Sequence, residues 1–309
     1  MKNYSYYQHT SLKTKILNQI RKVFIDGYPE KFLLNRIAAS GDSRFWLKVI
    51  PPEYLYPTSS WRYCERNGIQ LKLNISNVVD HLKYFLFKDA GFENFLNLLQ
   101  PHFTILDIGA NIGMTALEFA NKASTGKVVC FEPSPSNFER LKENISLNDF
   151  KNIITSKTGI GTVPGQFKLY NVVDNNPGMK RILEEAESAN FESETIVVDT
   201  LESQLEKLNI HQIDAIKIDV EGFELEVLKS AITILENFKP VLFIELDDNN
   251  LKDQHSSALQ LINYLIGLDY KIYNALDDKQ LLDADYDYSN CHFDIICQHT
   301  HFLPKKNLY

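Results

Sequence analysis

The sequence predicts an α/β fold built around a mostly parallel sheet. From residue 103 onward, short apolar runs typical of strands alternate with longer amphipathic runs typical of helices. A strand, a helix and a second strand in succession form a right-handed crossover that leaves the two strands parallel. A glycine-rich turn, LDIGANIG, follows the first of these strands, where such sheets bind ligands. The 309 residues, 44% of them hydrophobic, are sufficient for a large core.

The individual elements follow from the same periodicities. Seven runs have the length and apolar character of strands, namely 103–108, 127–131, 152–156, 213–219, 240–246, 270–274 and 292–298. Four runs have helical periodicity, namely 112–122, 136–147, 224–235 and 256–267. Because a polar stretch joins the last two strands, we expect them to pair antiparallel at the sheet edge. The prediction is a mostly parallel seven-stranded sheet with an antiparallel last strand.

One connection, residues 157–212, is much longer than the usual link between a strand and a helix. It contains two strand-like runs, QFKLY and ETIVV, and a short helical run near 179–188. This insert follows the third strand, close to the expected ligand edge. It either covers a ligand site or only decorates the sheet, and both interpretations remain open.

The first 75 residues have a different character. Residues 1–75 are predicted to form an accessory segment of helices and irregular structure, and residues 76–309 the α/β domain. Residues 1–50 hold nine Lys and Arg against three Asp and Glu, although the whole chain has a net charge of −8. We interpret this basic region as a solvated face, with a partner or membrane contact as the alternative.

A helix predicted over residues 11–24 places four apolar side chains on one face: Leu12, Ile16, Ile20 and Val23. We expect this face to pack on its own domain or on a second subunit, which makes a homodimer possible. The alternative is a basic amphipathic helix that lies on a membrane surface. We prefer packing, because the apolar face is narrow and contains no Trp.

The composition restricts which partners and which cellular compartment we expect for the chain. The acidic net charge argues against nucleic acid as a partner. Four cysteines without CxxC spacing indicate a reduced, intracellular chain without a disulfide framework or zinc site. The N-terminus has no apolar leader, and no apolar run approaches the roughly 18 residues of a membrane span. We therefore expect a cytoplasmic protein without a transmembrane segment, and we predict no metal site.

The glycine turn, Asp107–Gly113, restricts the ligand. Gly109 permits a positive φ and close approach of the backbone, and the helix that follows Gly113 offers free N–H groups. We expect Gly113 to let that helix pack tightly on the strand. The P-loop interpretation fails because Met114, not Lys, follows Gly113, and a dinucleotide fingerprint would need GxGxxG. The remaining pattern, DxGxxxG, is typical of Rossmann-like methyltransferases that bind S-adenosylmethionine.

Acidic residues follow three neighbouring strands. Glu132 comes directly after KVVCF, 19 residues beyond Gly113, where a carboxylate can accept from both ribose hydroxyls of an adenosine ligand. In DAIKIDVEGFELEVL, Asp219 and Glu221 lie at and just past a strand end, and Lys217 needs a partner in its apolar strand. The strand PVLFIEL continues this set with Glu245, followed by Asp247 and Asp248.

Together these motifs resemble the FkbM-type methyltransferases. The blocks that carry the resemblance are DIGANIG (107–113), FEP (131–133), NFERLKEN (137–144), VDTLESQL (198–205), IKIDVEGFELEVLKS (216–230) and PVLFIEL (240–246). They cover about residues 102–246, and the first 75 residues fall outside them. The resemblance implies a class I (Rossmann-like) methyltransferase fold, S-adenosylmethionine as the methyl donor, and methylation of a hydroxyl on a sugar, glycan or secondary metabolite.

The resemblance also implies a role for each matching residue. The methionine end of the cofactor would be lined by Asp107, Gly109, Ala110, Asn111 and Gly113. The ribose would be held by Glu132, with Pro133 and Ser134 beside it. Thr158 and Gly159 would lie near the adenine edge, where the acidic residue of many relatives is absent. Asp219 and Glu221 would face the transferred methyl group.

An alcohol acceptor must lose its proton during methylation, which gives the acidic pair a catalytic role. We hypothesise that Glu221 or Asp219 accepts this proton. The alternative is structural: Asp219 holds the amino group of the cofactor and Glu221 caps the following helix. A metal-dependent variant, less favoured, would use Asp219 with Asp247, Asp248 and Asn249, in a manner similar to catechol O-methyltransferases.

Other function classes stay open at this point. The enzyme could act on a protein or a lipid-linked glycan at a membrane surface through its basic N-terminal helix. A non-catalytic adenosine-binding module is a further alternative, although the intact motifs argue against a decayed site. NAD-dependent oxidoreduction would require the missing GxGxxG.

Overall fold

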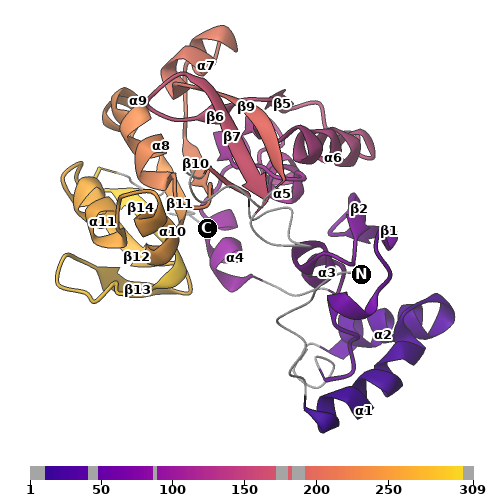
Figure 1. Ribbon diagram of the computed structural model, residues 1–309. Helices are drawn as coiled ribbons and strands as arrows, with labels where there is room; N and C mark the ends of the chain where they lie inside the picture. The colour runs from indigo at the N-terminus through magenta and orange to yellow at the C-terminus, as the bar shows by residue number, and fades with distance from the viewer. Residues whose placement is uncertain (1–10, 41–47, 86–88, 172–179, 183–191, 302–309) are drawn as a thin grey trace, which may run out of the picture. The chain divides into compact units, whose positions relative to one another are not determined.

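The computed structural model (Figure 1) describes residues 11–40, 48–85, 89–171, 180–182 and 192–301. The chain forms two compact units. The first comprises Met1–Cys64 and Lys72–Lys88, and the second comprises Glu65–Leu71 and Asp89–Tyr309. The division expected between residues 75 and 76 stays a prediction.

An eight-stranded sheet forms the centre of the second unit, in the order β13-β12-β14-β11-β10-β3-β4-β5 (Figure 1). Its strands are β3 (Thr104–Ile108), β4 (Lys127–Phe131), β5 (Ile153–Ser156), β10 (Ala215–Ile218), β11 (Val241–Asp247), β12 (Tyr270–Asn274), β13 (Asp277–Leu282) and β14 (His292–His299). Strands β3, β4, β5, β10 and β11 are parallel, whereas β14 is antiparallel to both of its neighbours. The strand order reverses between β3 and β10, so a ligand site is expected at their carboxyl ends.

This topology confirms the predicted fold class and the antiparallel last strand. The predicted number of seven strands is one too few, because β13 lies in the polar stretch 275–291 between the last two predicted strands. β13 forms an antiparallel hairpin with β12, and Ile272 pairs with Leu282. Because this edge strand contains many charged residues, its sequence does not show the alternation of apolar and polar residues that is typical of a strand.

Alternate residues of the strands supply a core on each face of the sheet, as a doubly wound fold requires. Leu106 and Ile108 of β3 pack in one core, and Ile105, which precedes them, packs in the other. The first core contains residues of α7 (Leu201–Lys207), α8 (Glu224–Ser230), α9 (Ile232–Phe238), α10 (Asp248–Asp253) and α11 (Ala258–Ile266). The second contains residues of α4 (Ala90–Leu96), α5 (Met114–Lys122) and α6 (Pro135–Ser146). The helix predicted over 224–235 is two helices, because the chain leaves helical angles at Ala231 (φ −104°, ψ 11°).

The insert after β5 forms a second sheet of four strands, in the order β6-β9-β7-β8. These strands are β6 (Gly159–Ile160), β7 (Gly165–Asn171), β8 (Lys180–Ile182) and β9 (Ser193–Asp199). The two strand-like runs therefore form the predicted strands, β7 and β9. The short helix predicted near 179–188 is wrong at residues 180–182, which form β8, and its remainder lies outside the described residues.

The first unit contains α1 (Leu12–Arg21), η2 (Lys22–Phe24), α2 (Gly27–Ser40), η4 (Glu53–Leu55) and α3 (Val78–Tyr84). A hairpin of β1 (Trp61–Arg66) and β2 (Ile69–Asn74) adjoins them, and its tip, Glu65–Leu71, groups with the second unit. Glu30 of α2 is buried and binds Arg62 and the Tyr84 hydroxyl.

The apolar face of α1 remains exposed. Its four predicted side chains are between 58% and 74% accessible: Leu12, Ile16, Ile20 and Val23. The expectation that this face packs on its own domain is therefore wrong for the described residues, and a second subunit stays a prediction. No helix among the described residues is long and apolar enough to cross a membrane.

Candidate active site

The glycine turn begins directly after β3 and packs against the end of β10. Gly109 has φ 82°, and its N–H and that of Ala110 donate to the Phe131 carbonyl at 3.0 and 3.1 Å. A Cβ on Gly109 would lie 1.8 Å from the carbonyl oxygen of Asp219. Any side chain at residue 109 would therefore push the two strand ends apart.

Gly113 at the end of the turn has φ 87° and directly precedes α5. A Cβ there would lie 2.6 Å from Leu141 Cδ1 of α6, so the close packing is between α5 and α6. This corrects our expectation that Gly113 brings its helix close to the strand. Asn111, which also has a positive φ of 49°, completes the turn.

Glu132 at the end of β4 is 5% exposed and is held by two backbone amides. Its Oε2 accepts from the Asn111 N–H at 2.8 Å, and its Oε1 accepts from the Ser134 N–H at 2.9 Å. An ionised carboxylate has about four acceptor positions, so both oxygens can also accept from a diol. The Ser134 side chain caps α6 and donates to Glu194 Oε2 of β9 at 2.5 Å.

A buried lysine links the turn to β10. Lys217 Nζ donates to the Gly109 carbonyl at 2.9 Å and lies 3.0 Å from Asp219 Oδ2. It also lies 3.7 Å from Asp107 Oδ1, while Asp107 Oδ2 accepts from the Thr115 hydroxyl at 2.6 Å. Burial raises the pKa of Asp107, although Lys217 and Thr115 oppose that rise. Burial lowers the pKa of Lys217, but the charges of Asp219 and Asp107 outweigh it and keep that pKa raised.

Three carboxylates meet beside this lysine. Asp219, Glu221 and Glu245 each place an oxygen within 4.8 Å of the others. Glu221 has φ 56°, and its Oε2 accepts from the Asn250 amide at 3.0 Å. Burial, followed by the charges of Asp219 and Glu221, raises the pKa of Glu245 to about 10. At neutral pH Glu245 therefore keeps a proton, which lowers the repulsion within the group.

Glu224, not Glu221, holds the loop before α8. Glu224 Oε1 accepts from the N–H groups of Val220 and Gly222, each at 3.0 Å. Burial is the largest influence on Glu224 and raises its pKa to about 7. The structural alternative in which Glu221 caps the following helix is therefore wrong, since α8 begins without a side-chain cap.

Asp247 and Asp248 have structural partners elsewhere. Asp247 caps α10 and lies 2.8 Å from His292 Nδ1. Asp248 accepts from the backbone N–H groups of Ala258 and Asn290. The metal-ligand set that joined these two residues to Asp219 does not come together, and the carboxylate group at the site contains Glu245 instead.

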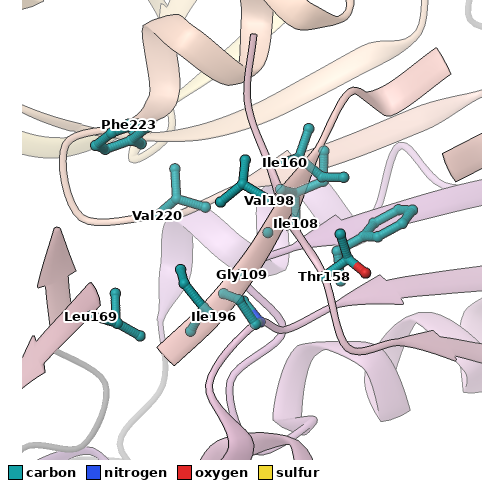
Figure 2. A pocket seen from close by; sticks show the side chains of 12 residues that line it. Ile108, Gly109, Thr158, Ile160, Leu169, Ile196, Val198, Val220 and Phe223 are labelled. Atoms are coloured by element: carbon teal, nitrogen blue, oxygen red, sulfur yellow. The ribbon is translucent and has the colours of Figure 1, made fainter. Parts of the chain in front are cut away.

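A cavity with about 480 Å³ of empty space lies over the carboxyl ends of the strands (Figure 2). Four predicted cofactor residues line it: Gly109, Pro133, Thr158 and Gly159. The other lining residues are Ile108, Phe131, Ile160, Leu169, Ile196, Val198, Val220 and Phe223. The other six predicted cofactor residues are not in the lining: Asp107, Ala110, Asn111, Gly113, Glu132 and Ser134.

Sequence reasoning left one part of this site open and missed another. The insert contributes Leu169, Ile196 and Val198 to the lining. Their alternation in the strand-like runs indicates a buried face, but it does not indicate what that face covers. The second part is Asp294, which pairs in register with Glu245. Burial, with the charges of Asp89 and Asp219, raises the pKa of Asp294 to about 7.

The strand order and the glycine turn define the molecule as a class I methyltransferase fold. The model of the methyltransferase FkbM domain matches residues 107–272, more than half of the chain. The chain therefore belongs to the FkbM methyltransferase family, and the predicted family is confirmed.

Several curated relatives are similar to part of the chain. Methyltransferase 1 of Beauveria bassiana is 28% identical over 142 residues, covering 40% of this chain and 57% of that protein. The hexuronic acid methyltransferase AglP of Haloferax volcanii is 30% identical over 136 residues, covering 44% and 53%. The 2-O-methyltransferase NoeI of Sinorhizobium fredii is 28% identical over 165 residues, covering 50% and 67%. The chain thus spans little more than half the length of the first two.

Among solved structures, the chain is similar to the methyltransferase FkbM from Methylobacillus flagellatus. The identity is 15% and the TM-score 0.42, with 93% of this chain and 59% of that chain covered.

The domain uses S-adenosylmethionine as its donor, as its family does, and the residues at the site fit this molecule. The cavity, which Gly109 helps to line, offers apolar walls for a base, and the buried Glu132 offers two oxygens for a diol. The predicted cofactor is confirmed, whereas the residues that bind it remain proposals.

Proposed function

We propose that this chain transfers the methyl group of S-adenosylmethionine to a hydroxyl on a sugar, a glycan or a secondary metabolite. The observation that supports this most is the position of Asp219 and Glu221, at the strand end that packs directly on the glycine turn. Two relatives also carry the names of a hexuronic acid methyltransferase and a 2-O-methyltransferase.

In this proposal the chain holds the donor with three groups of residues. The methionine end is bound by Asp107, Gly109, Ala110, Asn111 and Gly113. The ribose is bound by Glu132, with Pro133 and Ser134 beside it. The adenine edge is bound by Thr158 and Gly159. Asp107 acts through Lys217 and Thr115, since its side chain is fully buried.

The bound donor supplies an activated methyl group, and the chain must align the acceptor, exclude water and remove a proton. We assign proton acceptance to Glu221 and orientation to Asp219. Asp219 already binds the Lys217 ammonium, whereas the Asn250 amide that contacts Glu221 is neutral. The hydroxyl proton then passes to Glu221 Oε as the new C–O bond forms.

Labelled S-adenosylmethionine, incubated with the chain and an extract of glycans and metabolites, tests the proposed reaction. Mass spectrometry should detect a product that gains one methyl group on oxygen. Glu221→Gln should slow its formation about a hundredfold while leaving the affinity for S-adenosylhomocysteine unchanged. Label on nitrogen or carbon would contradict O-methylation, and cofactor binding without any transfer would favour a non-catalytic module. Full turnover of Glu221→Gln would remove its role as the base.

A second candidate function is methylation of a lipid-linked glycan or a protein at a membrane surface. It is favoured by the exposed apolar face of α1, which lies among Lys13, Lys15, Arg21 and Lys22. Flotation with anionic vesicles at low and high salt separates the two candidates. Binding that falls with salt and with Ile16→Asp supports the second one.

A further inference from the structure

The inserted sheet presents two different faces. Along β9, the side chains of Glu194, Ile196 and Val198 alternate with Thr195 and Val197. Ile196 and Val198 are 3% and 7% exposed, whereas Val197 between them is 48% exposed. Of these five residues, Ile196 and Val198 line the cavity described above, together with Leu169 of the neighbouring strand β7 (Figure 2).

The inner face of β9 is fixed to the parts of the chain proposed to hold adenosine. β9 pairs parallel with β6, and Gly159 is in register with Val198. A Cβ built on Gly159 would lie 3.3 Å from Val198 Cγ2 and 3.4 Å from Pro133 Cβ. The loop after β4, the chain after β5 and β9 therefore meet at one point.

A polar contact at the start of β9 adds to this attachment. Glu194 Oε2 accepts from the hydroxyl of Ser134, two residues after the proposed ribose ligand Glu132. The inner face thus begins with an anchor on the ribose loop and continues as an apolar surface over the cavity. An insert that only decorated the edge of the main sheet would contribute no side chains to the cavity lining, so this arrangement differs from such a decoration.

We propose that the inner face of β9, formed by Ile196 and Val198, is the wall against which the adenosine of the methyl donor packs. This inference rests on the proposed function, because it takes Glu132 as the ribose ligand. A base attached to that ribose extends past Pro133 into the apolar cavity, where Thr158, Gly159 and the β9 wall surround it. The insert is then part of the cofactor site, and the side chains on its inner face determine the affinity for the cofactor.

Calorimetric titration of the full chain with S-adenosylhomocysteine tests this wall. Ile196→Ser should weaken binding about tenfold, because it removes one buried aliphatic contact. Val198→Phe should weaken it by at least as much, because the larger ring occupies the cavity. The matched controls Val197→Ser and Val197→Phe change the opposite face of the same strand, and we expect affinities within about twofold of wild type.

Hydrogen exchange of the wild-type chain tests the same wall without any substitution, so it does not depend on whether a variant folds. S-adenosylhomocysteine should slow amide exchange across β9. Unchanged exchange there, or wild-type affinity in folded Ile196→Ser and Val198→Phe, would overturn the inference while leaving the proposed function intact. If the wild-type chain binds no S-adenosylhomocysteine, the proposed function fails first and the inference fails with it.

Discussion

Each unit contains a cation that binds a buried carboxylate, and the two units differ in how closely the charges around that cation are matched. In the first unit, Arg62 binds both oxygens of Glu30, through Nε at 2.8 Å and Nη2 at 2.9 Å. In the second, the single ammonium of Lys217 faces both Asp107 and Asp219. Two further carboxylates, Glu221 and Glu245, gather beside Asp219.

The comparison distinguishes a structural ion pair from a site. The bidentate guanidinium neutralises the buried Glu30, and the second carboxylate near Arg62, that of Asp26 at 3.6 Å, is exposed to solvent. The Glu30 pair therefore fits a role in holding its unit together. Excess negative charge in a partly buried place raises pKa values and leaves groups ready to accept protons or bind donors. Burial, with the charges of Asp219 and Glu221 added to it, raises the pKa of Glu245 to about 10.

The largest effect should come from removing the shared cation. Lys217→Met leaves the buried Asp107 and its neighbour Asp219 without their ammonium, and we expect a loss of about 3–5 kcal/mol of unfolding free energy at pH 7. Urea unfolding measures this loss. The control is Lys229→Met, which removes an exposed ion pair with Glu226 and should change stability by less than about 1 kcal/mol. Equal effects of the two substitutions would contradict the buried role of Lys217.

A smaller effect is expected for the matched pair of the first unit. Arg62→Met should cost about 2 kcal/mol of stability, because Glu30 is buried but Arg62 is partly exposed. It should leave the affinity for S-adenosylhomocysteine unchanged, since the pair contributes to stability and not to the cofactor site. A tenfold loss of cofactor affinity in folded Arg62→Met would break the distinction between the two clusters.

The smallest effect concerns pH. The pKa of Glu224 rises from 4.5 to about 7 on burial, so the folded chain binds more protons than the unfolded chain between these values. Its contribution to stability is complete below pH 4.5 and is lost as pH rises toward 7, with a slope of about 1 kcal/mol per pH unit. Unfolding free energies of wild type and Glu224→Gln across this interval measure it. The variant should show a flatter dependence, and an unchanged slope would contradict the assignment.

The sequence predicts the geometry of the parallel strands well because its signals are local. The alternation of short apolar runs with helical runs predicted the parallel sheet. The motif DIGANIG predicted the turn, in which Gly109 and Gly113 have positive φ values. The strands β4 and β12 have the predicted bounds. These elements depend on neighbours in the chain, which a periodicity argument can read.

The remainder of the site depends on contacts between distant segments. Glu221 lies in the loop before α8 and Glu224 begins that helix, yet Glu221 contacts Asn250 whereas Glu224 binds the loop amides. Asp247 ends β11 and Asp248 follows it, near the strand end that the metal hypothesis required, but Asp247 caps α10 and Asp248 accepts from two backbone amides. The sequence does not distinguish these uses of a carboxylate, because each is decided by which donor lies opposite it in the fold.

The most direct test of the central claim is a calorimetric titration of the wild-type chain and Gly109→Val with S-adenosylhomocysteine and with NAD. If the carboxyl edge of β3 and β10 is the adenosylmethionine site, wild type binds one S-adenosylhomocysteine and does not bind NAD. Gly109→Val, whose side chain meets the Asp219 carbonyl, should lose that binding while circular dichroism shows a folded chain. Wild type that fails to bind S-adenosylhomocysteine, or folded Gly109→Val that binds it with unchanged affinity, would contradict the account.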